Sequence, residues 1–581
     1  MADDLFKLNV DGQDIEVPKS YTLMQACEEA GAEIPRFCYH ERLSVAGNCR
    51  MCLVQWVGAP KPIASCAQTV GEMRMNPDGT PPNIITRGDY VEKARKGVME
   101  FLLINHPLDC PICDQGGECD LQDQAVAYGR AGSRYELNKR AVEDKNMGPL
   151  VKTIMTRCIQ CTRCVRFAAE VAGVEEIGMI SRGENAEITT YLEESLTSEL
   201  SGNVIDLCPV GALTSKPYAF NARPWELRKT ESIDVMDAMG AGVRVDAKGD
   251  AVMRILPVLN EEVNEEWLSD KSRFIWDGLQ RQRLDKPYIR ENGKLRAATW
   301  GEAFEATKAA LTKPAEKIGA VAGDLIEVEQ AKAALDLFRA LGVQSTDCRP
   351  AGASYGADGV RERYILNPTL MGVEEADALL LIGVNPRVEA AVWNARIRKA
   401  WLWNDLKVGV IGDASDLTYD YTHLGDGPDA LNGLFSRDDA FVEALRNAER
   451  PMIVIGEGAL TREDSEAVLA KAHDFALEVG AVTEDWAGFG VLHSAAGRVG
   501  ALDVGFVPGE GGADTAAILG GALDTVVLLG VDDADLSQLK ASTVIYVGHH
   551  GDAGAAKADI ILPCAAYTEM AATYVNTEGR V

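Results

Sequence analysis

The cysteines of this chain are concentrated in its first 208 residues. Twelve of the 14 cysteines lie at or before Cys208, and only Cys348 and Cys564 lie in the rest of the 581-residue chain. A secreted disulfide framework is a property of short chains with a signal peptide, and the acidic start of this sequence has neither a basic segment nor an apolar one. Cysteines clustered at short spacing in such a chain predict metal sites.

The first group of four cysteines has a spacing close to that of a plant-type [2Fe–2S] site. Such a site has a C-x4-C-x2-C run and a distant cysteine, and here only the first loop is longer, with ten residues. Ahead of the group, residues 5–18 read as two strands around an Asp-Gly turn and residues 22–31 as a short helix, which is the order of a ferredoxin-like β-grasp domain. A zinc site and a redox-active C-x2-C pair are the alternatives, and a redox pair would not need the two outer cysteines. The group consists of Cys38, Cys49, Cys52 and Cys66.

The second group has only three cysteines, in the run NHPLDCPICDQGGEC. Three thiolates cannot fill four ligand positions, and His106 is the nearest candidate for the fourth, since imidazole replaces thiolate on iron in Rieske centres. A structural Cys3His zinc site would suit the same spacing, so the segment alone leaves iron and zinc open, and its iron-binding neighbours favour iron. Cys27 is left over on the apolar side of its helix, which indicates core packing. The second group consists of His106, Cys110, Cys113 and Cys119.

The third group is a C-x2-C-x2-C run followed at a distance by a Cys-Pro, as in bacterial ferredoxins. Many such ferredoxins hold two clusters and have a second run just before the distant cysteine. The corresponding positions in this chain hold Ser198, Ser201 and Val204, so we expect a single [4Fe–4S] cluster here. The group consists of Cys158, Cys161, Cys164 and Cys208.

From about Thr230 the sequence changes to short apolar runs that alternate with helical patterns such as residues 329–342. Buried strands alternating with helices predict parallel, doubly wound α/β sheets. The turns after these strands contain no G-x-G-x-x-G and no P-loop, and no combination of nucleophile, base and acid marks a catalytic site. We expect Cys348 and Cys564 to be packing residues. The predicted strands are residues 318–322, 378–382, 408–411, 452–455, 525–529 and 543–547.

Composition and charge restrict the partners of the chain. With 46 % apolar and 25 % charged residues, the sequence is that of a globular protein, and its 581 residues favour three or more domains. The formal net charge of −30 disfavours nucleic acid and anionic lipid as partners, since both attract Lys and Arg. No stretch approaches the roughly 18 uninterrupted apolar residues of a membrane span.

Together, the cysteine motifs resemble those of the large iron–sulfur subunit of respiratory complex I, the NADH:quinone oxidoreductase of bacteria and mitochondria. The matching stretches are IPRFCYH, GNCRMCLVQ, NHPLDCPICDQGGECDLQD, RCIQCTRCVRF and DLCPVGAL. The remainder is similar to molybdopterin oxidoreductases in the stretches WLSDKSRFIWDG, RLDKPYI, LLLIGVNPRVEAAVWNARIRKAW and YVNTEGRV. The resemblance covers essentially the whole chain.

The resemblance implies cofactors, ligands and a fold. The first group would hold one [2Fe–2S] cluster, and the second group, with His106, and the third group would each hold one [4Fe–4S] cluster. The implied fold is multidomain, α+β and α/β. It consists of a β-grasp [2Fe–2S] ferredoxin-like domain, a small His/Cys3 [4Fe–4S] domain, a bacterial ferredoxin-like [4Fe–4S] domain and a large molybdopterin-oxidoreductase-like α/β domain without molybdopterin. We expect these domains at residues 1–80, 81–145, 146–225 and 226–581.

The implied function is electron transfer within a proton-pumping translocase, with no substrate site on this chain. Electrons from NADH and FMN on a neighbouring subunit would pass through the three clusters toward downstream iron–sulfur subunits and quinone. We expect the [2Fe–2S] domain to face the flavin subunit and the third group to lie nearer the exit. The expected location is peripheral, on the cytoplasmic face of a bacterial inner membrane, or on the matrix side for a processed mitochondrial form.

The chain departs from the family pattern in two ways. Some members have an additional [4Fe–4S] cluster on a C-x2-C-x3-C run plus a distant cysteine, and we expect that cluster to be missing because no cysteine lies between positions 208 and 348. The chain also ends at NTEGRV, where relatives usually continue, which predicts a short copy or a sequence without its C-terminal end. The positions comparable to the additional ligands are Ser232, Val235, Met239 and Ser269.

Two other families carry similar N-terminal clusters. An iron hydrogenase needs further cysteines for its active-site cluster, and Cys348 and Cys564 cannot supply them. A formate dehydrogenase needs a ligand for molybdenum or tungsten and usually the additional cluster, so Cys348 alone is a poor candidate. The α/β part is therefore expected to keep a fold without its cofactor, since a fold does not by itself give a function.

Overall fold

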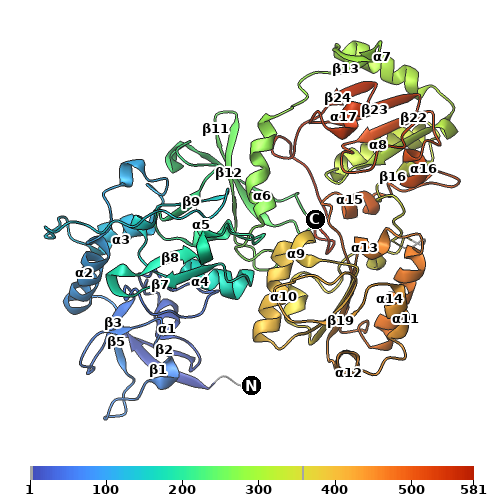
Figure 1. The fold of residues 1–581 in the computed structure, drawn as a ribbon. Helices are drawn as coiled ribbons and strands as arrows, with labels where there is room; N and C mark the ends of the chain where they lie inside the picture. The colour runs from blue at the N-terminus through green and yellow to red at the C-terminus, as the bar shows by residue number, and fades with distance from the viewer. Residues whose placement is uncertain (1–3, 356–358) are drawn as a thin grey trace. The chain divides into compact units, whose positions relative to one another are not determined.

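The computed structural model describes residues 4–355 and 359–581. It divides into two compact units, unit 1 ending at Leu227 and unit 2 running from Arg228 to Val581, and each is described by itself (Figure 1). The division falls where the sequence changes from cysteine motifs to alternating strand and helix patterns. No helix in the described ranges is long and apolar enough to cross a membrane.

Unit 1 begins with a mixed five-stranded sheet in the order β2-β1-β5-β3-β4. Strands β1 and β2 form the predicted hairpin, and Asp11 and Gly12 in its turn have φ values of 48° and 91°, the positive values that such a tight turn requires. The predicted helix α1 is capped by Thr22 in a capping box and shares one apolar core with the sheet. The bounds are β1 Leu5–Val10, β2 Gln13–Pro18, α1 Leu23–Glu29, β3 Leu53–Trp56, β4 Ile63–Ala64 and β5 Asn83–Ile85.

The rest of unit 1 consists of short elements around the second and third cysteine groups. Helix α2 precedes the second group and α3 begins directly after Cys119. Helix α4 begins between Cys161 and Cys164, and α5 ends directly before Cys208. Strands β6 and β9 pair antiparallel, as do β7 and β8. The bounds are α2 Asp89–Leu103, α3 Asp120–Tyr128, β6 Val151–Thr153, α4 Arg163–Phe167, β7 Ile177–Ile180, β8 Glu187–Thr190, α5 Asn203–Leu207 and β9 Leu213–Ser215.

Unit 2 starts with a three-stranded antiparallel sheet, β10-β11-β12, followed by the short helix α6. Asp246 of β11 is fully buried, and its carboxylate pairs with Arg244 and Arg254, each at 2.8 Å. Both arginines bond the carboxylate, as a buried charge requires. The bounds are β10 Arg228–Ile233, β11 Gly242–Lys248, β12 Ala251–Pro257 and α6 Asp270–Phe274.

The remainder of unit 2 contains the two doubly wound sheets that the sequence predicts. An all-parallel sheet has the order β19-β18-β17-β20-β21, and a seven-stranded sheet has the order β14-β13-β24-β23-β22-β15-β16, with the β13–β14 hairpin antiparallel at one edge. All six predicted strands are present to within one residue at each end, and the predicted helix at 329–342 is α8. The strands are β13 Tyr288–Glu291, β14 Lys294–Ala297, β15 Ile318–Ala322, β16 Ser345–Asp347, β17 Ala378–Ile382, β18 Lys407–Ile411, β19 Thr422–Gly425, β20 Pro451–Gly456, β21 Phe489–Leu492, β22 Thr525–Leu529, β23 Thr543–Gly548 and β24 Ile560–Pro563. The helices are α7 Trp300–Leu311, α8 Val328–Ala340, α9 Pro386–Glu389, α10 Ala391–Trp403, α11 Pro428–Gly433, α12 Ala440–Asn447, α13 Glu457–Leu460, α14 Ser465–Glu478, α15 Arg498–Asp503, α16 Thr515–Leu519 and α17 Ala553–Lys557.

Both doubly wound sheets are buried on both faces. In β17, Leu379 and Leu381 belong to one apolar core. The alternate residues Ala378, Leu380 and Ile382 belong to another. Strand β22 of the larger sheet is divided between two cores in the same way. A strand covered on both faces has no polar positions, which is why these strands read as continuous apolar runs in the sequence.

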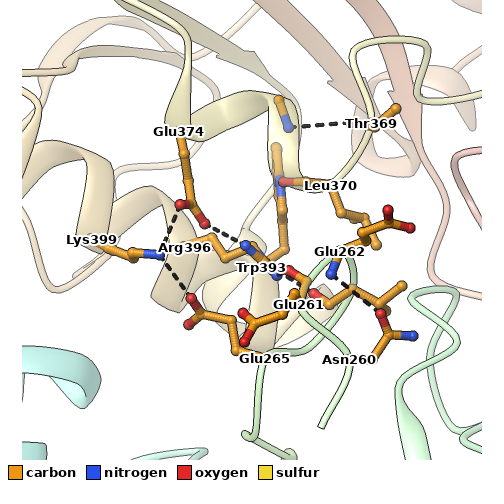
Figure 2. Close-up of polar contacts among 12 residues, drawn as sticks. Asn260, Glu261, Glu262, Glu265, Thr369, Leu370, Glu374, Trp393, Arg396 and Lys399 are labelled. Atoms are coloured by element: carbon orange, nitrogen blue, oxygen red, sulfur yellow. Dashed lines mark hydrogen bonds and ion pairs between the residues drawn. The ribbon is translucent and has the colours of Figure 1, made fainter. Parts of the chain in front are cut away.

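A buried arginine holds the loop between β12 and α6 against α10 (Figure 2). Arg396, only 2 % exposed, donates to the Val263 carbonyl oxygen at 3.0 Å and to a second loop carbonyl, and it pairs with the Glu374 carboxylate. Lys399, one turn along α10, bonds Glu374 at 2.8 Å and Glu265 of the loop at 2.7 Å. Two cations of one helix face thus fix the loop through both backbone and carboxylate oxygens.

Replacing Arg396 with methionine removes one of the two cations that bond the Glu374 carboxylate and takes the side-chain donor from two loop carbonyls. Removing one partner of a buried ion pair costs about 3 kcal/mol of unfolding free energy. We expect a lower midpoint of urea unfolding, followed by tryptophan fluorescence. The exposed pair Lys332–Asp336 provides a matched control, since Lys332→Met should change the free energy by less than about 0.5 kcal/mol. Equal midpoints for the two variants would contradict the role given to Arg396.

Candidate metal centres

The thiols of the first group converge in a buried loop. The amide of Cys38 donates to the Cys49 sulfur at 3.4 Å, and the sulfurs of Cys52 and Cys66 lie 3.4 Å apart. The thiols of Cys49 and Cys66 also donate to the Cys38 sulfur, which lowers the pKa of Cys38 and raises the pKa of both donors. Strand β3 begins directly after Cys52, and Cys66 follows β4, so a hairpin holds two of the four positions.

This arrangement fits an iron–sulfur cluster by the chemistry of its donors. All four cysteines are at most 9 % exposed, so the unligated thiols must share protons among themselves. Four thiolates buried together would need a cationic metal centre to compensate their charge. A zinc site would use the same four donors, so metal analysis distinguishes the two alternatives.

The third group lines a single apolar cavity. Its walls are the four cysteines together with apolar side chains such as Met155, Ile188 and Leu213. Burial, followed by the neighbouring thiols, raises the pKa of Cys161 to about 11, and burial raises the pKa of Cys208 to about 12. The same cause raises the pKa values of Cys158 and Cys164.

Backbone amides compensate part of this penalty in the third group. The Gln160 amide donates to the Cys158 sulfur at 3.4 Å, and amides of residues 210, 212 and 213 lower the pKa of Cys208. Gln160 and Thr162 adopt left-handed conformations with φ values of 51° and 62°, which turn the loop amides between the cysteines. Four thiols around one cavity, with amide donors aimed at sulfur, are the donor set of a cubane cluster.

The second group is more open. Cys113 and Cys119 are buried, and burial raises the pKa of Cys119 to about 11, whereas Cys110 is exposed in a turn of 3-10 helix. His106 lies beside Asp109, the residue before Cys110, and burial, Arg157 and Lys139 lower its pKa to about 4. Its Nδ1 atom is buried without a hydrogen-bond partner. A neutral imidazole with a free nitrogen is a suitable metal ligand, although no hydrogen bond in the described ranges joins it to the three thiols.

The loop that carries Cys38 and Cys49 packs directly on the third group. The side-chain amide of Asn48 donates to the Gln160 carbonyl oxygen at 3.2 Å. Arg163, in α4 between two cysteines of the third group, donates to the Tyr39 carbonyl oxygen at 2.7 Å. The residue next to Cys38 is therefore bonded to the segment that carries Cys161 and Cys164.

The second group also packs on the third. Arg157, next to Cys158, bonds Asp109 at 3.0 Å, and the Cys119 sulfur lies 3.7 Å from the Pro209 carbonyl oxygen. A β-carbon at Gly211 would lie only 2.1 Å from the Cys113 sulfur, so glycine is required there. The third group therefore has polar contacts with both of the others. The expectation that it lies nearer the exit stays a prediction.

The segment compared with the additional cluster is arranged differently from the expectation. Ser232 lies on the exposed strand β10, away from the buried positions of the segment. A C-x2-C-x3-C spacing that starts two residues later than expected falls on Asp234, Asp237 and Ala241. All three residues are buried, and so is Ser269. Ser272 donates to the Asp234 carboxylate at 2.5 Å and lies 2.8 Å from the Ser269 hydroxyl. Carboxylates and hydroxyls therefore occupy the place that the spacing gives to thiols.

The remaining cysteines differ from one another. Cys27 and Cys348 lie in apolar cores, as expected. Cys564 is half-buried and lines a cavity of about 630 Å³ with His549 and His550, so the packing role expected for it was too simple. Within residues 4–355 and 359–581, no group of three or more His, Cys, Asp or Glu side chains is placed to hold a single metal ion.

Five family models match successive parts of the chain. They are a 2Fe-2S iron-sulfur cluster binding domain at residues 3–74, an NADH-ubiquinone oxidoreductase-G iron-sulfur binding region at 95–134, and an NADH-quinone oxidoreductase subunit 3 ferredoxin-like domain at 148–214. An NADH-ubiquinone oxidoreductase NDSU1/NuoG-like 4Fe-4S domain matches 227–277, and the molybdopterin oxidoreductase model matches 283–581. The predicted series of domain types is confirmed.

Named relatives match over nearly the whole chain. The G subunit of the NADH-quinone oxidoreductase of Rickettsia felis is 52 % identical over 578 residues, which cover 99 % of this chain and 84 % of that protein. The chain belongs to the family of NADH-quinone oxidoreductase G subunits. A potato (Solanum tuberosum) relative, the mitochondrial NADH dehydrogenase [ubiquinone] iron-sulfur protein 1, is 51 % identical over 582 residues, 99 % of this chain and 77 % of that protein. A chain of a solved NAD+-reducing [NiFe]-hydrogenase is 25 % identical, with a TM-score of 0.33 over 37 % of this chain and 90 % of that chain.

Sequence reasoning missed three features of this family member. Gly211 was not singled out, although it leaves room for Cys113. The arginines of RCIQCTRCVRF make the contacts between the groups. Their place within the cysteine motif could have indicated this role. The carboxylates Asp234 and Asp237 were passed over because the spacing was set two residues early.

Asp237 should give unit 2 a pH-dependent stability. Burial, together with the neighbouring Asp234, raises the pKa of Asp237 from its usual 3.8 to about 7. A raised pKa means that the folded state holds the proton more tightly, so unfolding free energy falls as pH rises from about 4 to about 7, by at most about 1.4 kcal/mol per pH unit. Asp237→Asn should flatten this slope in urea titrations at several pH values. Asp485→Asn, at an exposed position, is the control. Equal slopes of unfolding free energy against pH in the two variants would contradict the raised pKa of Asp237.

Proposed function

We propose that the three groups hold three iron–sulfur clusters. Cys38, Cys49, Cys52 and Cys66 hold a [2Fe–2S] cluster, His106, Cys110, Cys113 and Cys119 hold a [4Fe–4S] cluster, and Cys158, Cys161, Cys164 and Cys208 hold a second [4Fe–4S] cluster. The observation that carries this proposal is the apolar cavity lined by the four cysteines of the third group. The domain ranges that go with it are 1–80, 81–145, 146–225 and 226–581.

The function that follows is electron transfer in NADH:quinone oxidoreductase, the activity named for the family. When bound, such clusters accept and release one electron at a time. The residues of unit 1 surround the cysteines of the third group with apolar side chains and donate backbone amides to sulfur. The contacts Asn48–Gln160 and Arg157–Asp109 support a relay in the order first, third, second group.

The exposed end of this series is the second group. Leu108 and Ile112, on either side of the exposed Cys110, are 89 % and 61 % exposed. Apolar side chains beside an open ligand are the features of a surface that a partner covers. We place the downstream iron–sulfur subunits at this face and the NADH- and FMN-binding subunit at the [2Fe–2S] end, with the assembly peripheral on the cytoplasmic face, or on the matrix side in a mitochondrion.

The α/β domain is proposed to carry no molybdopterin. Two of its cavities, of about 630 and 420 Å³, lie at the carboxyl ends of parallel strands, where such folds bind cofactors. The larger cavity has five carboxylates in its lining against one lysine, Lys271, and the pKa of His549 is lowered to about 4, so this histidine stays neutral. A phosphate-bearing pterin does not fit an acidic lining, because like charges repel at close range. The carboxylates are Asp324, Glu327, Asp532, Asp533 and Asp552.

Metal analysis of the chain purified without oxygen tests the proposal. We expect about ten irons per chain, with no stoichiometric molybdenum, tungsten or zinc, and the electron paramagnetic resonance signals of three clusters after reduction. About six irons and one zinc would make the second group structural. Stoichiometric molybdenum or tungsten would overturn the cofactor-free α/β domain.

His106→Ala tests whether this histidine belongs to the second group alone. Because His106 is assigned to the second group only, the variant should lose or alter one [4Fe–4S] signal and keep the other two. Cys348→Ala is the control, and it should leave every signal unchanged because this thiol lies in an apolar core. Three unchanged signals in the His106 variant would remove this residue from the ligand set.

A further inference from the structure

One arginine side chain spans the boundary between the first and the third cysteine groups. Arg166 lies in α4, directly beyond the C-x2-C-x2-C run. Its Nη2 atom donates to the Cys38 carbonyl oxygen at 2.5 Å and to the Cys161 carbonyl oxygen at 3.2 Å. Its Nη1 atom donates to the Ser44 carbonyl oxygen at 2.5 Å. A single nitrogen therefore bonds the backbones of two residues that belong to different candidate metal sites.

The surroundings of Arg166 hold it in this position. Its Nε atom lies 3.4 Å from the Thr162 hydroxyl, so the guanidinium is fixed on both edges. The Ser44 amide in turn donates to Glu170 at 2.8 Å, which ties the same loop to the segment after α4. These contacts place the guanidinium between Cys38 of one group and Cys161 of the other.

The chemistry of arginine suits this boundary. A guanidinium stays positively charged at every physiological pH, and its planar fork of donors can serve several oxygens at once. Both neighbouring sites would carry negative charge, which increases by one when a site accepts an electron. A fixed positive charge between them favours the reduced form of each.

We propose that Arg166 is a positioning residue for electron transfer between the first and third groups. It fixes the distance between them through the Cys38 and Cys161 carbonyls, and its charge stabilises the reduced form of both sites. In each transfer one site is oxidised by one electron and the other is reduced by one, with no bond made or broken and no proton moved. This inference rests on the ligand assignment of the proposed function.

The test is a redox titration of the holo-chain, followed by electron paramagnetic resonance. Arg166→Gln removes the charge while keeping a side chain of similar reach. We expect the reduction equilibrium constants of both the first and the third site to fall by about tenfold, which is about 59 mV in each potential. The reduction equilibrium constant of the second site should change by less than threefold.

Two further variants make the result decisive. Arg134→Gln removes an exposed charge that pairs with Glu100 in unit 1. It should leave the reduction equilibrium constants of all three sites within threefold of those of the unaltered chain. Arg166→Lys keeps the charge and should also stay within threefold. If Arg166→Gln prevents either site from assembling, the lysine variant decides alone, and a tenfold shift in it overturns the role of the charge.

The outcomes separate this inference from the proposed function. Unaltered chain that lacks the iron or the signals of the first and third sites contradicts the ligand assignment. Full iron and three signals in Arg166→Gln, with both potentials unchanged or only one lowered, overturn the role of Arg166 and leave the assignment intact.

Discussion

The constraint on which unit 1 depends is the burial of thiols whose charged form is the useful one. Burial raises the pKa of Cys161 to about 11 and that of Cys208 to about 12, so without metal the third group keeps its protons. A metal cluster reverses this, because it binds thiolates and releases protons. The cavity of the third group is lined by its four cysteines together with Leu213 of β9 and other apolar side chains. Metal binding at the proposed site would therefore stabilise the folded form of this part of the chain.

Directional polar contacts join the three groups of unit 1 to one another. The loop between Cys38 and Cys49 is joined to the third group by contacts of Asn48, Arg163 and Arg166. The third group is joined to the second by Arg157. Hydrogen bonds to backbone carbonyls have defined directions and lengths, whereas apolar packing tolerates repacking. A relay needs fixed separations between its sites, and directional contacts provide them. Unit 2 is built on the opposite principle, with strands such as β17 buried on both faces and with Arg396 as one of its few buried cations.

The sequence predicted much of the fold, for physical reasons that can be traced to particular residues. Strands such as β15 and β22 are continuous apolar runs, and the Asp11–Gly12 turn requires positive φ values that its residues favour. The convergence of the first and third groups followed from spacing. The packing of the groups against one another could not be predicted, because it depends on contacts between residues far apart in the chain, such as Arg157 with Asp109. The pair Asp234 and Asp237 was missed because a spacing without its cysteines has no fixed register.

The exposure of Cys110 makes the three groups unequal in how they can be reached. Cys38, Cys52 and Cys66 are each 1 % exposed, and the cysteines of the third group line an apolar cavity. In the second group the Cys110 thiol lies at the surface, where molecular oxygen can reach it. Since the oxidation of a cysteine follows its exposure, Cys110 is more open to damage by air than these buried thiols until a partner covers it.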